Sequence, residues 1–459
     1  VAGTRTAIAE ALSNIVWAPL KDGLQSVSLS ANWMWACKNE GEDARLYEAV
    51  QACSDFAIEL GINIPTGKDS LSMKQKYPND EVIAPGTVII SAAGNCTNIT
   101  KVVEPVLQRN GGNIYYLNLS QDSFKLGGSS FAQILNKVGT DVPSITDAAY
   151  FKTAFNTLQD AIKNRQIKAG HDVGSGGLIT TLLEMCFANT EGGMEINLNK
   201  IKENDIIKIL FAENPGIVIQ VKDKDKAEVK KILEDAGIGY VKLGTPTDER
   251  HILVTKEDAT YQFGIDYLRD VWYSTSYLLD RKQSMNGCAK KRFENYKEQP
   301  LEFVFDKSFT GKFSQYGITP ERRTPTGIKA AIIREKGTNG EREMAYMLYL
   351  AGFDVKDVTM TDLISGRETL EDINMIVFCG GFSNSDVLGS AKGWAGAFLF
   401  NPKAKAALDN FYARKDTLSL GVCNGCQLMI ELGLINPEHN KKAKMLHNDS
   451  HKFESRFLG

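Results

Sequence analysis

A short, glycine-framed segment around residue 423 limits the folds open to this chain more than any other feature. Residues 418–420 are apolar and extended in character, and residues 428–432 repeat apolar side chains at near-helical spacing. Cys423 therefore lies where a strand is predicted to turn sharply into a helix. Gly421 and Gly425 allow backbone conformations that a side chain would block. The segment thus predicts a strand–elbow–helix unit with a cysteine at the elbow.

Two interpretations of Cys423 are open from the elbow alone. At a helix N-terminus the dipole favours thiolate over thiol, which makes Cys423 a candidate nucleophile. Free cysteines are also commonly buried in cores. A second segment favours the nucleophile, because residues 373–379 read as a buried strand that runs into Gly380 and Gly381. In class I glutamine amidotransferases such a turn presents backbone N–H groups to the oxyanion, and the residue after the nucleophile, here Asn424, presents another.

Composition narrows the class of protein. The 459 residues are 43% hydrophobic and 24% charged, which is typical of an ordinary globular chain of about three domains. A net charge of −3 gives no reason to expect nucleic-acid binding. No apolar run has transmembrane length and no signal peptide is visible, so we expect no membrane partner. Eight scattered cysteines suggest reduced thiols and a cytoplasmic protein, and one lone C-x-x-C pair is weak evidence for zinc or redox chemistry.

The N-terminal region offers a possible pair of metal ligands. A helix is predicted over residues 4–18 and a second over residues 43–60, followed by a buried strand over residues 87–93. Glu10 and Asn14 lie four residues apart on the polar face of the first helix, so their side chains meet. A solvated face is the usual meaning of such a pair. The alternative is a pair of oxygen ligands for Mg²⁺.

Three further segments suggest anion binding. Residues 61–73 are predicted to form a turn in which an ammonium, hydroxyls and backbone N–H groups converge, although a charged surface turn is equally compatible. Residues 120–130 and 171–177 are glycine-rich loops before predicted helices, a position that binds phosphate through backbone donors. His171 and Asp172 stand beside the second loop, where the aspartate could ligate phosphate-bound Mg²⁺ and the histidine could equally be a satisfied core residue.

Taken together, these segments resemble the large, single-chain phosphoribosylformylglycinamidine synthase family of purine biosynthesis, in the family's order and over essentially the whole chain. The glutaminase part of the resemblance rests on residues 377–383, 386–389 and 421–427. The part similar to the second aminoimidazole-ribonucleotide (AIR) synthetase-like repeat rests on residues 10–14, 29–34, 65–73, 171–172 and 176–178. A single amidotransferase elbow is moderately specific, whereas this ordered set is highly specific.

The resemblance implies roles for individual residues. Cys423 matches the glutaminase nucleophile. In the family, three positions hold Mg²⁺ on a bound ADP that does not turn over. They match Glu10, Asn14 and Asp172 of this chain. In related synthases one loop lines the ATP and substrate site, and it matches Gly67, Lys68 and Ser70. A metal-binding asparagine of that loop is replaced here by Lys68, so the resemblance excludes a metal role for Lys68.

The chain also departs from the family pattern. Gly174 and Ser175 replace a serine and an aspartate of the second glycine-rich loop, so a nucleotide contact through that serine side chain is lost. The family's triad histidine and glutamate lie more than a hundred residues beyond the nucleophile. We interpret His439, His447 and His451 as surface residues.

The resulting prediction is an AIR-synthetase-like mixed α/β repeat followed by a doubly wound, parallel-sheet class I glutaminase domain. The predicted divisions are residues 1–110 and 111–298 for the two halves of the repeat, 299–326 for a linker and 327–459 for the glutaminase. Both ends look cut, so we expect a fragment that lacks N- and C-terminal parts of the same polypeptide.

Two functions from different classes remain open. The parent enzyme would convert formylglycinamide ribonucleotide, glutamine and ATP to the amidine, glutamate, ADP and phosphate, with a Cys423 thioester. The isolated fragment would instead be a non-catalytic nucleotide-binding module joined to an incomplete glutaminase.

Overall fold

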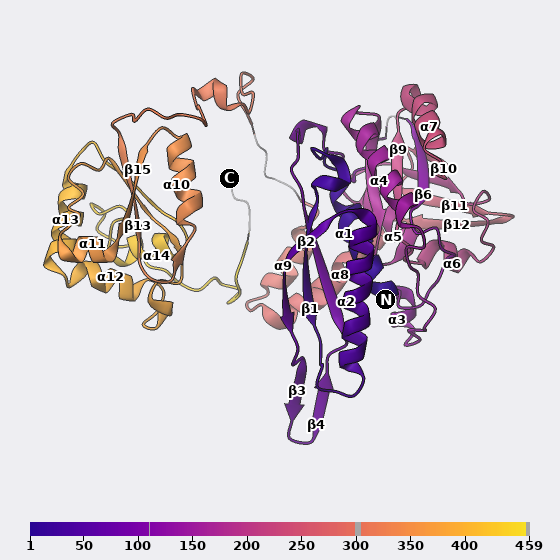
Figure 1. Ribbon diagram of the computed structural model, residues 1–459, viewed down its shortest axis with the longest axis horizontal. Coiled ribbons are helices and arrows are strands. Elements are labelled where there is room, and N and C mark those ends of the chain that lie inside the picture. Colours follow the sequence, from indigo (N-terminus) through magenta and orange to yellow (C-terminus); the bar gives the residue numbers. More distant parts are fainter. Residues whose placement is uncertain (110, 299–303, 456–459) are drawn as a thin grey trace. The chain divides into compact units, whose positions relative to one another are not determined.

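The computed structural model describes residues 1–109, 111–298 and 304–455, which form two compact units, Val1–Ser276 and Tyr277–Gly459 (Figure 1). Each unit is described by itself. Residue 110, at the end of the first predicted division, lies outside the described residues. So do residues 299–303 at the start of the predicted linker and residues 456–459 at the end of the predicted glutaminase. The predicted divisions therefore stay predictions.

A small three-stranded sheet opens the first unit. Its strand order is β2 (Asn63–Ser70), β1 (Ser28–Met34) and β5 (Thr87–Ala93), with β1 parallel to β2 and antiparallel to β5. α1 (Ala2–Ile15) and α2 (Glu42–Leu60) bury apolar stripes in the core that this sheet shares with the next one. α2 and β5 match their predicted positions, whereas α1 ends three residues before the predicted residue 18.

The predicted turn over residues 61–73 is wrong, because most of it forms strand β2. β2 is an edge strand, so the missing N–H of Pro65 breaks no ladder between neighbours. Position 67 requires a glycine because the neighbouring strand β1 comes very close to it. A Cβ there would lie 2.2 Å from the carbonyl oxygen of Ala31, its partner in the parallel ladder. The proline and glycine that signal a turn thus serve a strand here.

A seven-stranded mixed sheet forms the rest of the first unit. Its order is β12 (Ala259–Gly264), β11 (His251–Lys256), β8 (Gly193–Asn197), β10 (Val241–Thr247), β6 (Asn113–Asn118), β9 (Gly216–Val221) and β7 (Ile167–Val173). Side chains alternate between two cores, since Tyr115 and Ile217 enter one and Tyr116 and Val218 the other. α4 (Ala148–Lys163) and α7 (Lys226–Asp235) lie in the first core, and α5 (Gly177–Phe187) in the second.

The remaining elements of this unit are short or peripheral. They are η1 (Gly23–Ser26), β3 (Lys74–Tyr77), β4 (Asp80–Ile83), η2 (Ile99–Lys101), α3 (Ser130–Ile134), α6 (Ile206–Phe211) and η3 (Asp223–Asp225). The boundary between the two units falls within α8 (Ile265–Gln283).

The second unit contains a four-stranded parallel sheet, which confirms the predicted doubly wound arrangement. Its order is β15 (Asp354–Thr359), β13 (Lys329–Arg334), β16 (Met375–Phe378) and β18 (Leu418–Gly421). Alternate residues of β13 enter two cores, Ala331 and Ile333 on one face and Ala330 and Ile332 on the other. Helices therefore cover both faces, as a parallel sheet requires (Figure 1).

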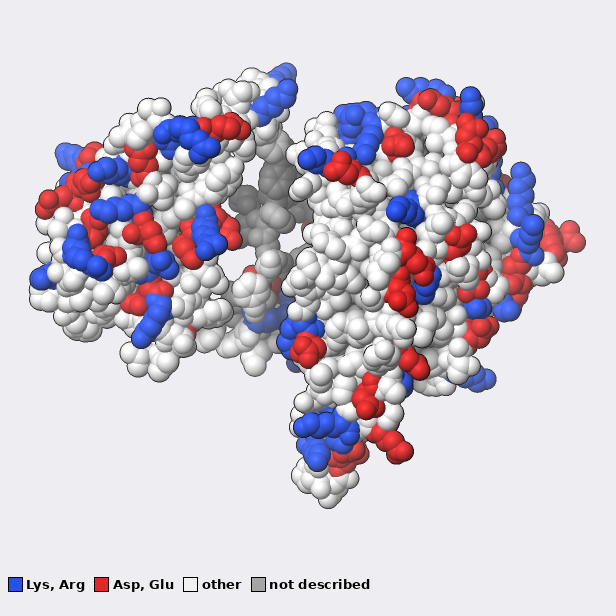
Figure 2. Space-filling model, in the orientation of Figure 1, with Lys and Arg blue, Asp and Glu red and all other residues white. Residues whose placement is uncertain are grey.

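The helices and smaller elements of the second unit complete the chain. They are α9 (Cys288–Asn295), η4 (Phe313–Tyr316), β14 (Thr338–Asn339), α10 (Glu341–Leu350), α11 (Met360–Ser365), β17 (Gly380–Gly381), η5 (Ser383–Asp386), α12 (Lys392–Leu399), α13 (Pro402–Ala413) and α14 (Asn424–Glu431). Among the described residues, no helix is both long and apolar enough to cross a membrane. On the face drawn in Figure 2, acidic and basic side chains are interspersed.

Candidate functional sites

Cys423 lies at the predicted elbow, between strand β18 and helix α14. Its backbone has φ 53° and ψ −108°, which is strained for a residue with a side chain. A Cβ on Gly425 would lie 2.1 Å from the carbonyl oxygen of Phe378, and one on Gly421 would lie 2.6 Å from that of Gly425. The two glycines therefore let the helix start directly against β16, which leaves the Cys423 side chain exposed.

The two-glycine turn lies beside the cysteine. A Cβ on Gly380 would be 3.2 Å from the Cβ of Cys423 and 3.9 Å from its Sγ. Gly381 has φ 113°, and a Cβ there would meet the carbonyl oxygen of Gly337 at 2.6 Å. This turn forms β17, which pairs with β14 in an antiparallel ladder. The structure thus brings Cys423, Gly380 and Gly381 together from segments that the sequence separates.

Asn424 adds a contact that sequence reasoning missed. Its buried side chain accepts a hydrogen bond at Oδ1 from the backbone N–H of Ser383 (3.3 Å), and its Nδ2 donates to Gln427 Oε1 (3.0 Å). Its backbone N–H belongs to the first turn of α14, where amides have no partner within the helix. The side chain therefore ties the 383–386 turn to the elbow. No local pattern signals this tie, because the two segments are far apart in sequence.

The other thiols of this unit are less exposed than Cys423, whereas three of its histidines are exposed. Cys379 is buried, and burial raises the pKa of its thiol to about 11. The predicted surface positions of His439, His447 and His451 are confirmed, since all three are exposed.

A cavity of about 440 Å³ lies beside the 383–388 turn; its lining includes Glu335, Ser383 and Asn384 but not Cys423.

A pair of carboxylates meets in the first unit. Glu10 projects from α1 and Asp172 from the end of β7, and Gly174 lies against both: a Cβ there would be 3.6 Å from Asp172 Oδ2 and 3.8 Å from Glu10 Oε1. Burial raises the pKa of Glu10, and the negative charges of Asp172 and Glu213 raise it further. Asn14 follows one turn after Glu10 and donates from Nδ2 to the Glu10 carbonyl oxygen at 2.8 Å. Helix α1 and strand β7 thus bring Glu10 and Asp172 together, whereas the Asn14 amide bonds the backbone of Glu10 and not, as predicted, its side chain.

His171 is satisfied by hydrogen bonds, as one predicted alternative had it, but it is only partly buried. Its Nδ1 lies 3.3 Å from Asp172 Oδ1 and its Nε2 lies 3.2 Å from Glu184 Oε2. Burial lowers the pKa of His171, but the hydrogen bonds to Asp172 and Glu184 outweigh it and raise the pKa to about 10. Glu184 also accepts a hydrogen bond from Trp272 Nε1 at 3.0 Å. At neutral pH a protonated His171 is therefore held between two carboxylates.

The remaining predicted binding residues lie elsewhere. Gly67, Lys68 and Ser70 lie on edge strand β2, at the opposite edge of the small sheet from β5, the strand that α1 packs against. The Lys68 ammonium donates to the Ser70 hydroxyl. Strand β2 therefore contributes none of its three predicted residues to the Glu10–Asp172 pair. Among the described residues, no group of three or more His, Cys, Asp or Glu side chains is arranged to hold a metal ion.

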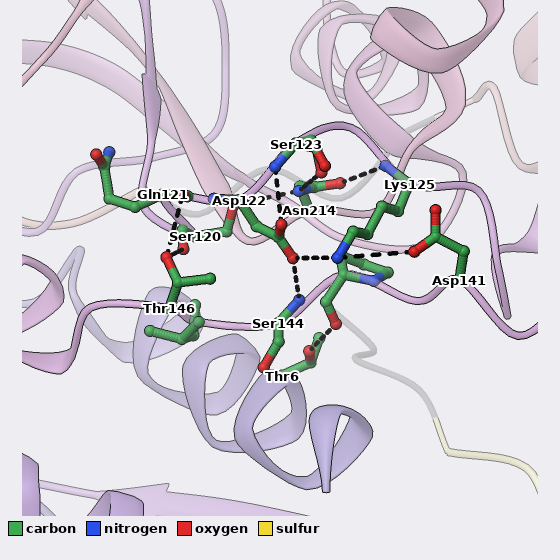
Figure 3. A network of polar contacts seen from close by, with 12 residues as sticks. Thr6, Ser120, Gln121, Asp122, Ser123, Lys125, Asp141, Ser144, Thr146 and Asn214 are labelled. Carbon is green, nitrogen blue, oxygen red and sulfur yellow. Dashed lines mark hydrogen bonds and ion pairs between the residues drawn. The ribbon is translucent and has the colours of Figure 1, made fainter.

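The first glycine-rich loop, residues 120–130, uses its backbone donors within the protein. The N–H groups of Gly127 and Gly128 donate to the carbonyl oxygens of Asp141 and Val138, at 2.9 and 2.7 Å. Asp122 accepts from the N–H of Ser144 and from the ammonium of Lys125, as Figure 3 shows. These contacts lock the loop against residues 138–146 and engage donors that a phosphate would need.

Comparison with known proteins finds matches along the whole chain. Three family models match: a CobB/CobQ-like glutamine amidotransferase domain at residues 327–459, an FGAR-AT PurM_N-like domain at 1–95, and the C-terminal domain of AIR synthase related protein at 109–256. A human phosphoribosylformylglycinamidine synthase is 40% identical over 97% of this chain and 33% of its own length. A probable chloroplastic/mitochondrial phosphoribosylformylglycinamidine synthase of Arabidopsis thaliana is 38% identical over 99% of this chain and 32% of its own length.

A solved structure is also similar. Thermotoga maritima PurL complexed with FGAR has a TM-score of 0.45 and 12% identity over 58% of this chain and 42% of that chain. The chain spans about a third of the length of the curated relatives it matches.

Proposed function

Because the chain is homologous over nearly its whole length to one third of phosphoribosylformylglycinamidine synthase, we propose that it is the corresponding part of such an enzyme. The enzyme would use ATP to convert formylglycinamide ribonucleotide, with nitrogen from glutamine, to formylglycinamidine ribonucleotide. Glutamate, ADP and phosphate would be the other products. The second unit would supply ammonia and the first would bind a nucleotide.

The observation that carries the glutaminase role is the elbow at Cys423 beside Gly380 and Gly381. The Cys423 sulfur attacks the side-chain amide carbon of glutamine, the carbon–nitrogen bond breaks, and ammonia leaves with the thiol proton. Water then hydrolyses the glutamyl thioester to glutamate and regenerates the thiol. Backbone N–H groups of the glycine turn and of Asn424 would stabilise the oxyanion.

Replacement of the nucleophile tests this role. In the whole enzyme, Cys423→Ser should lower the glutamine-dependent reaction by roughly 10³-fold or more, since a serine hydroxyl without an activating base is a far weaker nucleophile than a cysteine thiolate. The reaction with added ammonia should persist, because the synthetase unit is untouched. A Cys423→Ser enzyme that retains glutamine-dependent turnover would exclude Cys423 as the nucleophile.

The first unit is proposed to bind Mg²⁺ and an adenine nucleotide, ATP or a structural ADP. The support is the meeting of Glu10 and Asp172 around Gly174, together with a Glu10 pKa raised partly by neighbouring negative charge. A divalent cation would relieve this repulsion and would neutralise phosphate oxygens. Asn14 would add an amide oxygen. Carboxylate and amide oxygens are the donors that Mg²⁺ prefers, so the residues fit the ion.

Calorimetry tests this site without reference to activity. ADP should bind at millimolar Mg²⁺ and lose affinity in EDTA, and Asp172→Asn should weaken the Mg²⁺-dependent part. Absence of ADP binding by the isolated chain would count against an autonomous site and would leave only a site shared with other parts of the polypeptide.

The alternative is that the isolated chain is a non-catalytic nucleotide-binding module. The resemblance places the triad histidine and glutamate more than a hundred residues beyond Cys423. Without that base, general acid–base assistance worth roughly 10²–10⁴-fold is lost. A glutaminase assay on the purified chain separates the two, and substantial turnover would mean that His439, His447 or His451 supplies a base.

A further inference from the structure

Glu213 joins two turns that are far apart in sequence. It lies in the connection between α6 and β9, and its Oε1 accepts hydrogen bonds from the backbone N–H groups of both Gly176 and Ser130, each at 2.7 Å. One carboxylate oxygen therefore holds the start of α5 and the start of α3. Neither the Cys423 elbow nor the set of proposed metal ligands assigns a role to Glu213.

The neighbouring Asn214 has a different and separable task. Its buried side chain accepts at Oδ1 from the N–H of Lys125 (3.2 Å) and donates from Nδ2 to the carbonyl oxygen of Ser123 (2.9 Å) and the hydroxyl of Ser120 (3.2 Å). Figure 3 shows these contacts within the locked 120–130 loop. Asn214 thus holds the loop whose donors are already engaged, whereas Glu213 reaches the turn after β7.

The turn after β7 directly follows Asp172, the member of the carboxylate pair that lies at the end of that strand. Gly174 accepts a hydrogen bond from the N–H of Gly177 at 3.0 Å, which closes the turn, and Gly176 at its centre has φ 87°. Asp172 lies two residues before Gly174, and a Cβ on Gly174 would meet both the Asp172 and the Glu10 carboxylates, at 3.6 and 3.8 Å. The bond from Gly176 to Glu213 therefore holds the backbone that sets Asp172 opposite Glu10.

We propose that Glu213 is a positioning residue for the Glu10–Asp172 site, acting through the two backbone N–H groups that share its Oε1. The proposal rests on the Mg²⁺-nucleotide function proposed above. Glu213 lies close enough for its charge to affect Glu10, so a direct charge effect on the cation is the competing explanation. Because one oxygen accepts both hydrogen bonds, a substitution can remove the charge and keep the bonds, or keep the charge and remove them. The two explanations can therefore be separated.

Two conservative substitutions divide geometry from charge. Glu213→Gln keeps an Oε1 that can accept both N–H groups but removes the charge. Glu213→Asp keeps the charge but is one methylene shorter, so its oxygen cannot reach both donors. Asn214→Ala is the matched control, because it removes hydrogen bonds of the neighbouring side chain that do not reach the turn after β7.

Binding of ADP at millimolar Mg²⁺, measured by calorimetry on the intact protein, is the first readout. We expect Glu213→Asp to weaken affinity roughly tenfold, as for the loss of hydrogen bonds to a charged acceptor, and Glu213→Gln to stay within about threefold. Asn214→Ala should lower the melting temperature and leave affinity unchanged. A larger loss for Glu213→Gln than for Glu213→Asp would overturn the proposal in favour of a charge effect.

Amide hydrogen exchange is the second readout, and it needs no ligand. In Glu213→Asp the amides of Gly176 and Ser130 should exchange roughly tenfold faster than in the wild type, and in Glu213→Gln they should not. If the wild type binds no Mg²⁺-ADP, the nucleotide function fails while the exchange result still decides whether Glu213 orders the turn. Unchanged exchange at Gly176 in Glu213→Asp would overturn the positioning role.

Discussion

The cysteine elbow and the carboxylate pair are built in opposite ways. At the elbow, Gly421, Cys423 and Gly425 belong to one short segment; Gly425 packs closely against Phe378, Gly421 packs against Gly425, and Cys423 has a strained backbone. The carboxylate pair instead combines α1 with the end of β7, and it depends on partners such as Glu184 and Glu213 from still other segments. A site of the first kind can be recognised from a short motif, whereas a site of the second kind depends on the packing of the whole unit.

Selective alkylation gives the largest expected contrast and tests the local nature of the elbow. Cys423 is exposed at a helix N-terminus, whereas Cys379, directly after strand β16, is buried with its pKa raised to about 11. With limiting iodoacetamide at pH 8, Cys423 should be labelled roughly 10²-fold faster than Cys379, because the thiolate is the reacting species. Mass-spectrometric mapping measures the order, and Cys426, one turn further into α14, should follow Cys423. First labelling of Cys379 or Cys426 would show that the elbow is assigned wrongly.

A glycine substitution tests how tightly the elbow packs. Gly425→Ala would place a Cβ 2.1 Å from the Phe378 carbonyl oxygen, so the free energy of unfolding of the second unit should fall by about 2 kcal/mol. Gly396→Ala is the matched control in the same unit, because its Cβ would meet only Phe400, at 3.7 Å, within helix α12. That control should be neutral or stabilise by up to about 1 kcal/mol. Denaturant unfolding compares them, and equal effects would contradict the packing argument.

A substitution of His171 tests how far the Glu10–Asp172 carboxylate pair depends on partners from other segments. His171→Gln should destabilise the first unit by about 1–2 kcal/mol at pH 7, because hydrogen bonds to Asp172 and Glu184 are lost or weakened. The folded pKa of about 10 exceeds the ordinary value of 6.5, so this stabilisation is fully present below pH 6.5 and is lost as pH rises through 10.

The pH profile separates this effect from lost packing. Unfolding in EDTA should show the gap between wild type and His171→Gln narrowing from pH 7 to pH 10. A gap that is constant over this range would mean that the protonated histidine contributes nothing and that the substitution acts through packing alone.

The sequence alone determined the local features of this protein. The parallel, doubly wound sheet, the strand-to-helix turn at Cys423 and helix α2 follow from periodicity and from glycine placement, which act over a few residues. The same local signals failed over residues 61–73, where a proline and a glycine indicate a turn. The fold instead uses this segment as edge strand β2, whose pairing with β1 is a long-range contact.

Only the tertiary structure decided how the separate segments meet. It placed Gly380 against Cys423, and it linked the Asn424 side chain to the 383–386 turn. It also engaged the backbone donors of the 120–130 loop within the protein, although that loop has the composition of a phosphate site. The physical reason is the same in each case. A side chain or a backbone N–H is available for chemistry only if no other part of the chain uses it, and that depends on residues that are distant in sequence.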